Sequence, residues 1–147
     1  MSSIGGKNAL PLMAPYCASK FALEGFSDSL RMELQPWGIH VSVIEPGSIK
    51  TPLWDKGLDQ ADELLQRLPA AANELYGEAV IKAKVAADRE AKRGSSPEKV
   101  AIAVEHALTA TRPKTRYLVG LDARAVSLVK KLPDRAVDKL IRQQIGL

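Results

Sequence analysis

A long amphipathic segment followed directly by a short β-branched run constrains the fold of this chain more than any other feature. Residues 16–35 carry apolar side chains at helical spacing, and Pro36, Trp37 and Gly38 then end the predicted helix. The next residues, 39–45, read IHVSVIE and predict a strand that is buried on both faces. A helix, a tight turn and a buried strand in this order are typical of the second half of a right-handed βαβ unit. We therefore expect an α/β fold with a parallel sheet.

The predicted helix over residues 16–35 has three faces. Its apolar face, which we expect to pack on the core, consists of Leu23, Phe26, Leu30 and Leu34. Its polar face consists of Glu24, Asp28, Arg31 and Gln35. A third, narrow stripe of small residues consists of Ala18, Ala22, Gly25 and Ser29. Because small residues let another backbone approach closely, this stripe favours either the interface of a homo-oligomer or tight packing within the chain.

Most of the remaining sequence predicts helices. Residues 53–93 are rich in alanine, with Pro69 and Gly77 as interruptions, and they are too long for a plain connection, so they predict a helical flap. A serine cap and a first-turn proline then introduce a further helix and a short strand, with the sequences SSPEKVAIAVEHALTA and RYLVG. The tail, about residues 122–147, predicts two amphipathic helices divided by Pro133, covering about 123–131 and 134–144.

Composition narrows the classes of function. The chain has 147 residues, of which 46% are hydrophobic and 26% charged, as expected of one folded domain over residues 1–147. Its net charge of +4 is spread without basic runs or interleaved aromatic residues, so we expect no nucleic-acid partner. The sequence has no apolar run of membrane-spanning length and no signal-peptide pattern, and its single cysteine, Cys17, favours a reducing compartment. We therefore expect a cytoplasmic protein that does not associate with membranes.

Tyr16 and Lys20, at the start of the predicted long helix, are the first candidates for chemistry. Their spacing places the two side chains one helical turn apart on the same side. A lysine ammonium stabilises a neighbouring phenolate, so a tyrosine placed in this way can take up or release a proton. Ser3 lies upstream, at the end of an expected strand, where its hydroxyl could bond the same substrate oxygen. By themselves these residues are weak signals, because a capping tyrosine near a solvated lysine and a turn-forming serine are both common.

In combination, these residues resemble the short-chain dehydrogenase/reductase family. The similarity rests on SSIGG with Ser3, on YCASK as a form of the Tyr-x-x-x-Lys signature, and on PGSIKT, residues 46–51, directly after the predicted strand. The order and spacing of these motifs agree with the family, and SKFALEGFSDSLRMEL is similar to its active-site helix. The resemblance implies a Rossmann-like, doubly wound parallel sheet, of which this chain would be the C-terminal part with the N-terminal strands missing.

The resemblance implies a role for each of these residues in the interconversion of an alcohol and a carbonyl with NAD or NADP. Tyr16 would be the general acid/base, Lys20 would support Tyr16 and hold the nicotinamide ribose, and Ser3 would polarise the substrate oxygen. The PGSIKT motif would hold the nicotinamide. Pro46 and Gly47 would shape its pocket, the backbone of Ile49 would reach the carboxamide, and the Thr51 hydroxyl would bind it.

Two features of the expected enzyme stay open. The family's glycine-rich phosphate-binding turn has no counterpart here, so we expect either a piece of an active enzyme or a noncatalytic remnant or interaction module that binds no cofactor. The small-molecule substrate is expected to be hydrophobic, because VSVIEPG and LPDRAVDKLI are most similar to the branch that handles retinoids and hydroxysteroids. A reductase for acyl-carrier or polar-sugar substrates is the alternative. Cys17 is expected to be a buried packing residue, and His40 and His106 lack companions that would make a metal site.

Overall fold

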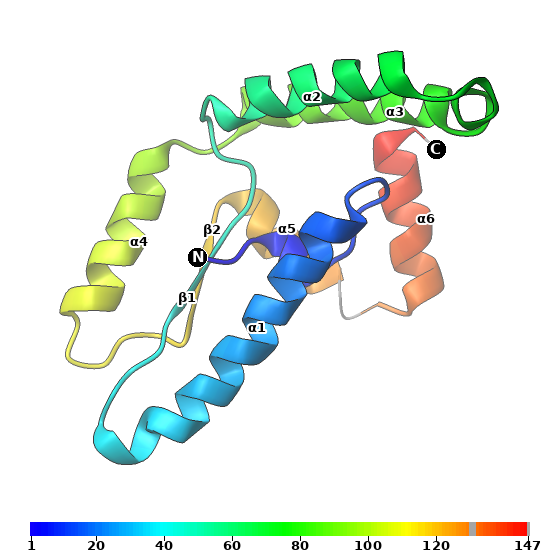
Figure 1. Cartoon of the computed structure of the whole chain (residues 1–147). Coiled ribbons are helices and arrows are strands. Elements are labelled where there is room, and N and C mark those ends of the chain that lie inside the picture. Colours follow the sequence, from blue (N-terminus) through cyan, green and yellow to red (C-terminus); the bar gives the residue numbers. More distant parts are fainter. Residues whose placement is uncertain (130–131, 147) are drawn as a thin grey trace.

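The chain forms an α/β unit in which helices surround a small parallel sheet (Figure 1). This computed structural model describes residues 1–129 and 132–146. The predicted α/β class is confirmed, and the arrangement is that of a part of a Rossmann-like fold. In chain order the elements are η1 (Ile4–Gly6), α1 (Ala14–Leu34), η2 (Gln35–Trp37), β1 (Val43–Pro46), α2 (Leu53–Arg67), α3 (Ala70–Arg93), α4 (Pro97–Thr109), β2 (Arg116–Val119), α5 (Leu121–Val129) and α6 (Asp134–Ile145).

The two strands pair in parallel, as the βαβ pattern predicted. Their register places Ile44 opposite Tyr117 and Pro46 opposite Val119. On the other edge of β1, the Ser2 N–H donates a hydrogen bond to the Ile44 carbonyl, at 2.8 Å, so the N-terminal segment continues the hydrogen bonding of the sheet. The carboxyl ends of both strands therefore meet at one edge, where α/β proteins place their ligands.

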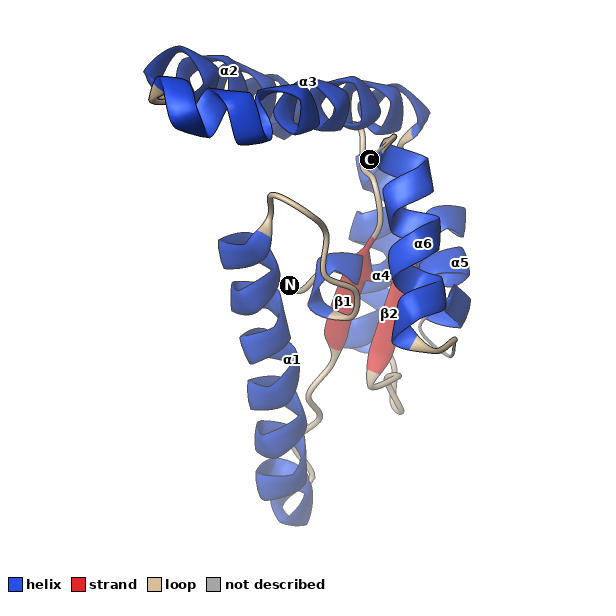
Figure 2. Ribbon diagram, turned by 90° about the vertical axis from the view of Figure 1, so that its right-hand side faces the viewer, coloured by secondary structure: helices blue, strands red, loops and turns tan. Residues whose placement is uncertain are grey.

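The two faces of this sheet have different chemistry, because successive side chains of a strand point to opposite sides. One face carries Ile44, Tyr117 and Val119, and α4 covers it with the apolar residues Val100, Ala103, Val104 and Ala107. The other face carries Glu45 and Arg116, which pair with each other, and Arg116 also pairs with Glu24 and Asp28 of α1. Figure 2 shows the two strands between α1 and the α5–α6 pair. The apolar core thus lies under α4, and an ionic cluster lies under α1.

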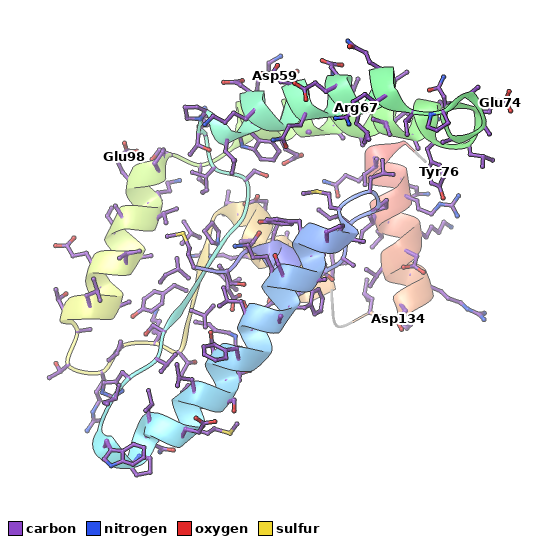
Figure 3. All side chains as sticks on the ribbon, in the orientation of Figure 1. Asp59, Arg67, Glu74, Tyr76, Glu98 and Asp134 are labelled. Atoms are coloured by element: carbon purple, nitrogen blue, oxygen red, sulfur yellow. The ribbon has the colours of Figure 1, made fainter. Side chains whose placement is uncertain are left out.

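Helices α2 and α3 form an antiparallel hairpin across one end of the molecule (Figure 1). Pro69 separates the two helices, as predicted, whereas Gly77 does not interrupt α3. Gly77 is buried inside α3, and a side chain there would begin 2.5 Å from Asn73 Oδ1. In Figure 3 the side chains of Asp59 and Glu74 point outward from this hairpin. The described residues include no helix that is both long and apolar enough to cross a membrane.

Three expectations about side chains and boundaries were wrong. Phe26, expected on the core face of α1, is 64% exposed, and Glu24, expected on the polar face, is buried because it pairs with Arg116. The first strand begins at Val43 instead of residue 39, so His40 precedes it and is exposed. Cys17 is buried, as expected. The predicted tail helix near 123–131 reaches residues 130–131, which lie outside the described residues, as does residue 147 at the end of the tail.

Candidate active site

Ser3 and Tyr16 meet around Gly5, where η1 and α1 begin. Ser3 is the cap of η1, and its Oγ accepts a hydrogen bond from the Gly5 N–H at 3.2 Å. Tyr16 lies in the first turn of α1, next to Pro15, which favours the start of a helix. A side chain on Gly5 would begin 2.9 Å from Tyr16 Cε1 and 3.7 Å from Ser3 Oγ. The absence of a side chain at Gly5 therefore lets the phenol ring pack against the segment that Ser3 caps.

Lys20 completes this group from the next turn of α1. Its Nζ lies 5.6 Å from the centroid of the Tyr16 ring, within the range of a cation–π interaction. The same ammonium donates a hydrogen bond to the Met1 carbonyl at 3.3 Å, which ties it to the N-terminal segment. The Tyr16 side chain is 40% exposed, so a ligand can reach the phenol. The three residues predicted to carry catalysis thus share one accessible surface.

Ser3 also joins this surface to the end of β1. Its Oγ donates a long hydrogen bond, 3.5 Å, to the carbonyl of Pro46, the first residue of the PGSIKT motif. The motif then turns away from the sheet, with the Gly47 N–H donating to the Val119 carbonyl at 2.9 Å. The predicted catalytic and cofactor-binding residues are therefore connected through Ser3 and Pro46, at the carboxyl edge of the sheet.

The later part of the motif lies against α2 and the residues before α4. Ile49 pairs with Ser95 in a short parallel bridge, and its carbonyl accepts a hydrogen bond from the Trp54 indole N–H at 2.7 Å. Thr51 lines a groove of about 440 Å³ together with Lys50, Trp54, Asp55, Asp88, Ala91 and Lys92. The lining of this groove includes none of Ser3, Tyr16 and Lys20. The structure thus brings Pro46 to the tyrosine group and places Thr51 in a groove of its own.

A buried carboxylate lies directly before the motif. The Glu45 side chain is fully buried and pairs with Lys7 at 2.5 Å and with Arg116 at 3.0 Å. Burial raises the pKa of Glu45 above its usual range, and the hydrogen bond from Lys7 opposes this shift. On α1, Asp28 accepts a hydrogen bond from Arg116 at 2.8 Å, which lowers the pKa of that carboxyl. These charges link η1, α1 and both strands beneath the tyrosine group.

Three residues next to the motif were not predicted from the sequence: Trp54, Ser95 and Asp122. Asp122 accepts a hydrogen bond from the Ser48 N–H at 2.5 Å. A signal for it existed, because VGLD places an acid just beyond the second strand, at the edge where PGSIKT follows the first. No such signal existed for Trp54 or Ser95. The contact of Trp54 with Ile49 depends on the path of the chain after β1, and the contact of Ser95 with Ile49 depends on its path after α3.

Comparison with known proteins shows which family has a similar sequence. The family model described as short chain dehydrogenase matches residues 1–62, which include every predicted site residue. The chain belongs to the short-chain dehydrogenase/reductase family. Family members use NAD or NADP, and the half-exposed Tyr16 phenol beside the Lys20 ammonium suits the nicotinamide ribose end of such a cofactor. The family predicted from the three motifs is therefore confirmed.

Relatives within the short-chain dehydrogenase/reductase family extend the similarity beyond residue 62. Retinol dehydrogenase 5 of Mus musculus is 42% identical over 134 residues, which cover 86% of this chain and 42% of the relative. Short-chain dehydrogenase/reductase family 9C member 7 of Bos taurus is 36% identical over 150 residues, covering 99% of this chain and 48% of the relative. The uncharacterized oxidoreductase YbbO of Escherichia coli K12 is 38% identical over 143 residues, covering 96% and 46%. The chain thus spans about half the length of the curated relatives it matches.

Proposed function

We propose that the protein containing this chain is an NAD(P)-dependent oxidoreductase that interconverts a hydrophobic alcohol and its carbonyl. The observation that carries this proposal is the packing of Ser3 and Tyr16 around Gly5, with Lys20 over the phenol ring. These groups supply a hydroxyl that can hold a substrate oxygen, a phenol that can move a proton, and a cation. Nucleotide cofactors of this type carry the hydride themselves, so the protein has to supply orientation and proton transfer.

In the oxidation direction, Tyr16 takes the proton of the substrate hydroxyl. A nicotinamide held by Lys20 and the PGSIKT motif would supply the hydride acceptor. Ser3 donates a hydrogen bond to the substrate oxygen and holds it beside the phenol. Lys20 stabilises the negative charge on the phenolate, because an ammonium close to an anion lowers its energy. In the reverse direction, the Tyr16 hydroxyl protonates the carbonyl oxygen. The short separations around Gly5 and the position of the Lys20 ammonium support these roles.

The PGSIKT motif is proposed to hold the nicotinamide end of the cofactor. Pro46 and Gly47 would shape its pocket, the backbone of Ile49 would meet the carboxamide, and the Thr51 hydroxyl would bind it. The connection of Pro46 to Ser3 supports this assignment, because it places the start of the motif beside the proposed proton carrier. The Ile49 carbonyl already accepts the Trp54 indole N–H, so the carboxamide would share that oxygen or use the Ile49 N–H.

A hydrophobic substrate is favoured by the α2–α3 hairpin and by one relative. Several large apolar side chains of this hairpin are exposed, among them Leu53, Leu64, Leu75, Tyr76, Ile81 and Val85. We propose that the hairpin, residues 53–93, is the flap that covers the substrate. The relative named retinol dehydrogenase 5 supports a retinol-like alcohol over a polar sugar.

The direct test uses the longest in-frame protein that contains these 147 residues, called the test protein below. It is mixed with NAD or NADP and with retinol, a hydroxysteroid or a polar sugar alcohol, and reduced nicotinamide is followed by its absorbance. We expect turnover of at least one hydrophobic alcohol and none of the sugar. Saturable cofactor binding without turnover of any alcohol or carbonyl would contradict the proposed reaction. Absence of any cofactor binding would support the alternative of a noncatalytic remnant or interaction module.

A further inference from the structure

Asp122 connects α5 to the first residues of the PGSIKT motif. It is the second residue of α5, and its Oδ2 accepts a hydrogen bond from the Ser48 N–H at 2.5 Å. The two residues are far apart in the sequence, and this bond joins the loop after β1 to the start of the helix after β2. A hydrogen bond to an ionised carboxylate is stronger than one between neutral groups. The bond therefore helps to fix the position of the motif's backbone relative to the carboxyl end of the sheet.

Two glycines leave room for this carboxylate. A side chain on Gly47 or on Gly120 would overlap the carboxylate oxygens of Asp122. Gly120 has a φ of +109°, which by itself favours glycine, whereas no such angle explains Gly47. The need for glycine at the second position of the motif is thus explained by the close approach of Asp122.

Ser48 makes further hydrogen bonds, which also restrain the backbone of the motif. Its carbonyl accepts a hydrogen bond from the Ser95 N–H at 2.8 Å, and its Oγ donates to Glu90 on α3 at 3.3 Å. Of these contacts, the one with Asp122 is the only bond from a charged side chain to the Ser48 backbone among the described residues. Removing it takes away the acceptor of the Ser48 N–H, between the backbone bonds that the motif makes to Val119 and to Ser95.

We propose that Asp122 is a positioning residue for the nicotinamide end of the cofactor. It acts through the backbone of Gly47 and Ser48 and touches neither substrate nor cofactor. The proposal rests on the proposed function, because it needs the PGSIKT motif to contact the nicotinamide. Without the carboxylate, the motif moves relative to Ser3 and Tyr16, so cofactor affinity and the rate of hydride transfer both fall. An asparagine in its place keeps an oxygen that accepts the Ser48 N–H.

The test compares Asp122→Ala with Asp122→Asn in the test protein. Calorimetry is expected to show a rise of about tenfold or more in the Kd for NAD(H) or NADP(H) for the alanine variant, against about threefold or less for the asparagine variant. Amide hydrogen exchange across residues 47–49 is expected to quicken in the alanine variant. Asp134→Ala is the matched control, because Asp134 also lies in the first turn of a helix, α6, and is exposed (Figure 3). This control is expected to leave Kd and exchange unchanged.

The outcomes separate this inference from the proposed function. If the parent protein binds a dinucleotide and Asp122→Ala binds it equally well, Asp122 does not position the motif, while the proposed function stands. Equal losses in the alanine and asparagine variants, with unchanged exchange at residues 47–49, also overturn the inference, because they indicate an effect of charge alone. If the parent protein binds no dinucleotide, the proposed function fails and the inference fails with it.

Discussion

Lys7 and Glu45 form an ion pair beside the proposed active site, with Nζ 2.5 Å from Oε2. Lys7 follows η1, which carries Ser3 at its cap, and Glu45 precedes Pro46, whose carbonyl accepts the Ser3 hydroxyl. The pair therefore holds together the two segments that Ser3 joins. Because the Glu45 side chain is fully buried, its protonation state affects both the stability of the protein and the environment of the site.

Glu45→Gln tests the raised pKa of this carboxyl. A raised folded-state pKa means that wild type loses free energy of unfolding as pH rises from about 4.5 through the folded pKa. The variant has no such loss, so its stability relative to wild type is expected to increase over that range and then level off. Urea denaturation at several pH values measures this difference.

Asp28→Asn is the control of opposite sign for that experiment. Its pKa is lowered from 3.8 by the hydrogen bond from Arg116, so its contribution to stability is lost as pH falls through the folded value. This variant is expected to lose stability relative to wild type as pH rises toward 3.8. A pH-independent difference between Glu45→Gln and wild type would show that Glu45 titrates normally.

Arg116→Ala tests the ionic cluster under α1. Arg116 bonds Glu24, Asp28 and Glu45, and its loss leaves buried carboxylates with fewer partners. We expect the free energy of unfolding to fall by about 3 kcal/mol, against about 0.5 kcal/mol or less for Arg112→Ala, an exposed arginine. Equal effects of the two substitutions in urea denaturation would mean that the cluster contributes no stability.

Gly5→Ala tests the packing of Tyr16 against the serine segment. The new methyl group would lie 2.9 Å from Tyr16 Cε1, so the phenol ring has to move away from residue 5. Turnover of the alcohol substrate is expected to fall by about 10–100-fold, because small displacements of reacting groups are costly. Gly57→Ala is the control, since a side chain at Gly57 meets no atom within 4 Å and alanine favours a helix. Full activity of the Gly5 variant would show that the ring position is not critical.

The small-residue stripe of α1 gives a prediction about assembly. All four of its residues are exposed, and within the described residues no atom lies within 4 Å of where a Gly25 side chain would begin. The described residues therefore do not pack on this stripe, and the homo-oligomer interface stays a prediction. Gly25→Arg is therefore expected to convert an oligomeric test protein into monomers in sedimentation experiments, whereas Gly57→Arg does not. A wild-type monomer, or an oligomer that survives the change, would exclude an interface through this stripe.

The sequence predicted the order of the elements better than the burial of individual side chains. Helical and β-branched patterns predicted α1 and the buried part of β1, because local spacing reports backbone structure. They could not predict that Glu24 is buried, since its partner Arg116 lies on a strand that folds back from much later in the chain. Helical spacing also could not predict that Phe26 is exposed, because a helix with apolar residues at several positions has more than one face that could pack on the core.

The same division applies to the candidate site. Ser3, Tyr16 and Lys20 could be proposed together because a family motif fixes their spacing, and the structure brings them together around Gly5. Asp122 and Lys7 support the site through contacts between segments far apart in the sequence, and Trp54 reaches Ile49 through the turn of the chain after β1. Sequence motifs therefore predicted the groups for chemistry, and the fold was needed to identify the residues that hold them.

Tyr16→Phe in the test protein is the most direct test of the proposed mechanism. The variant keeps the ring that packs on Gly5 and removes only the hydroxyl that moves the proton. We expect unchanged dinucleotide affinity and thermal stability, with kcat lowered by about 10²–10⁴-fold. Trp37→Phe, which removes the indole N–H of an exposed residue of η2 outside the site and the flap, is expected to keep full activity. Near-normal turnover in the Tyr16 variant would contradict the assignment of Tyr16 as the proton carrier.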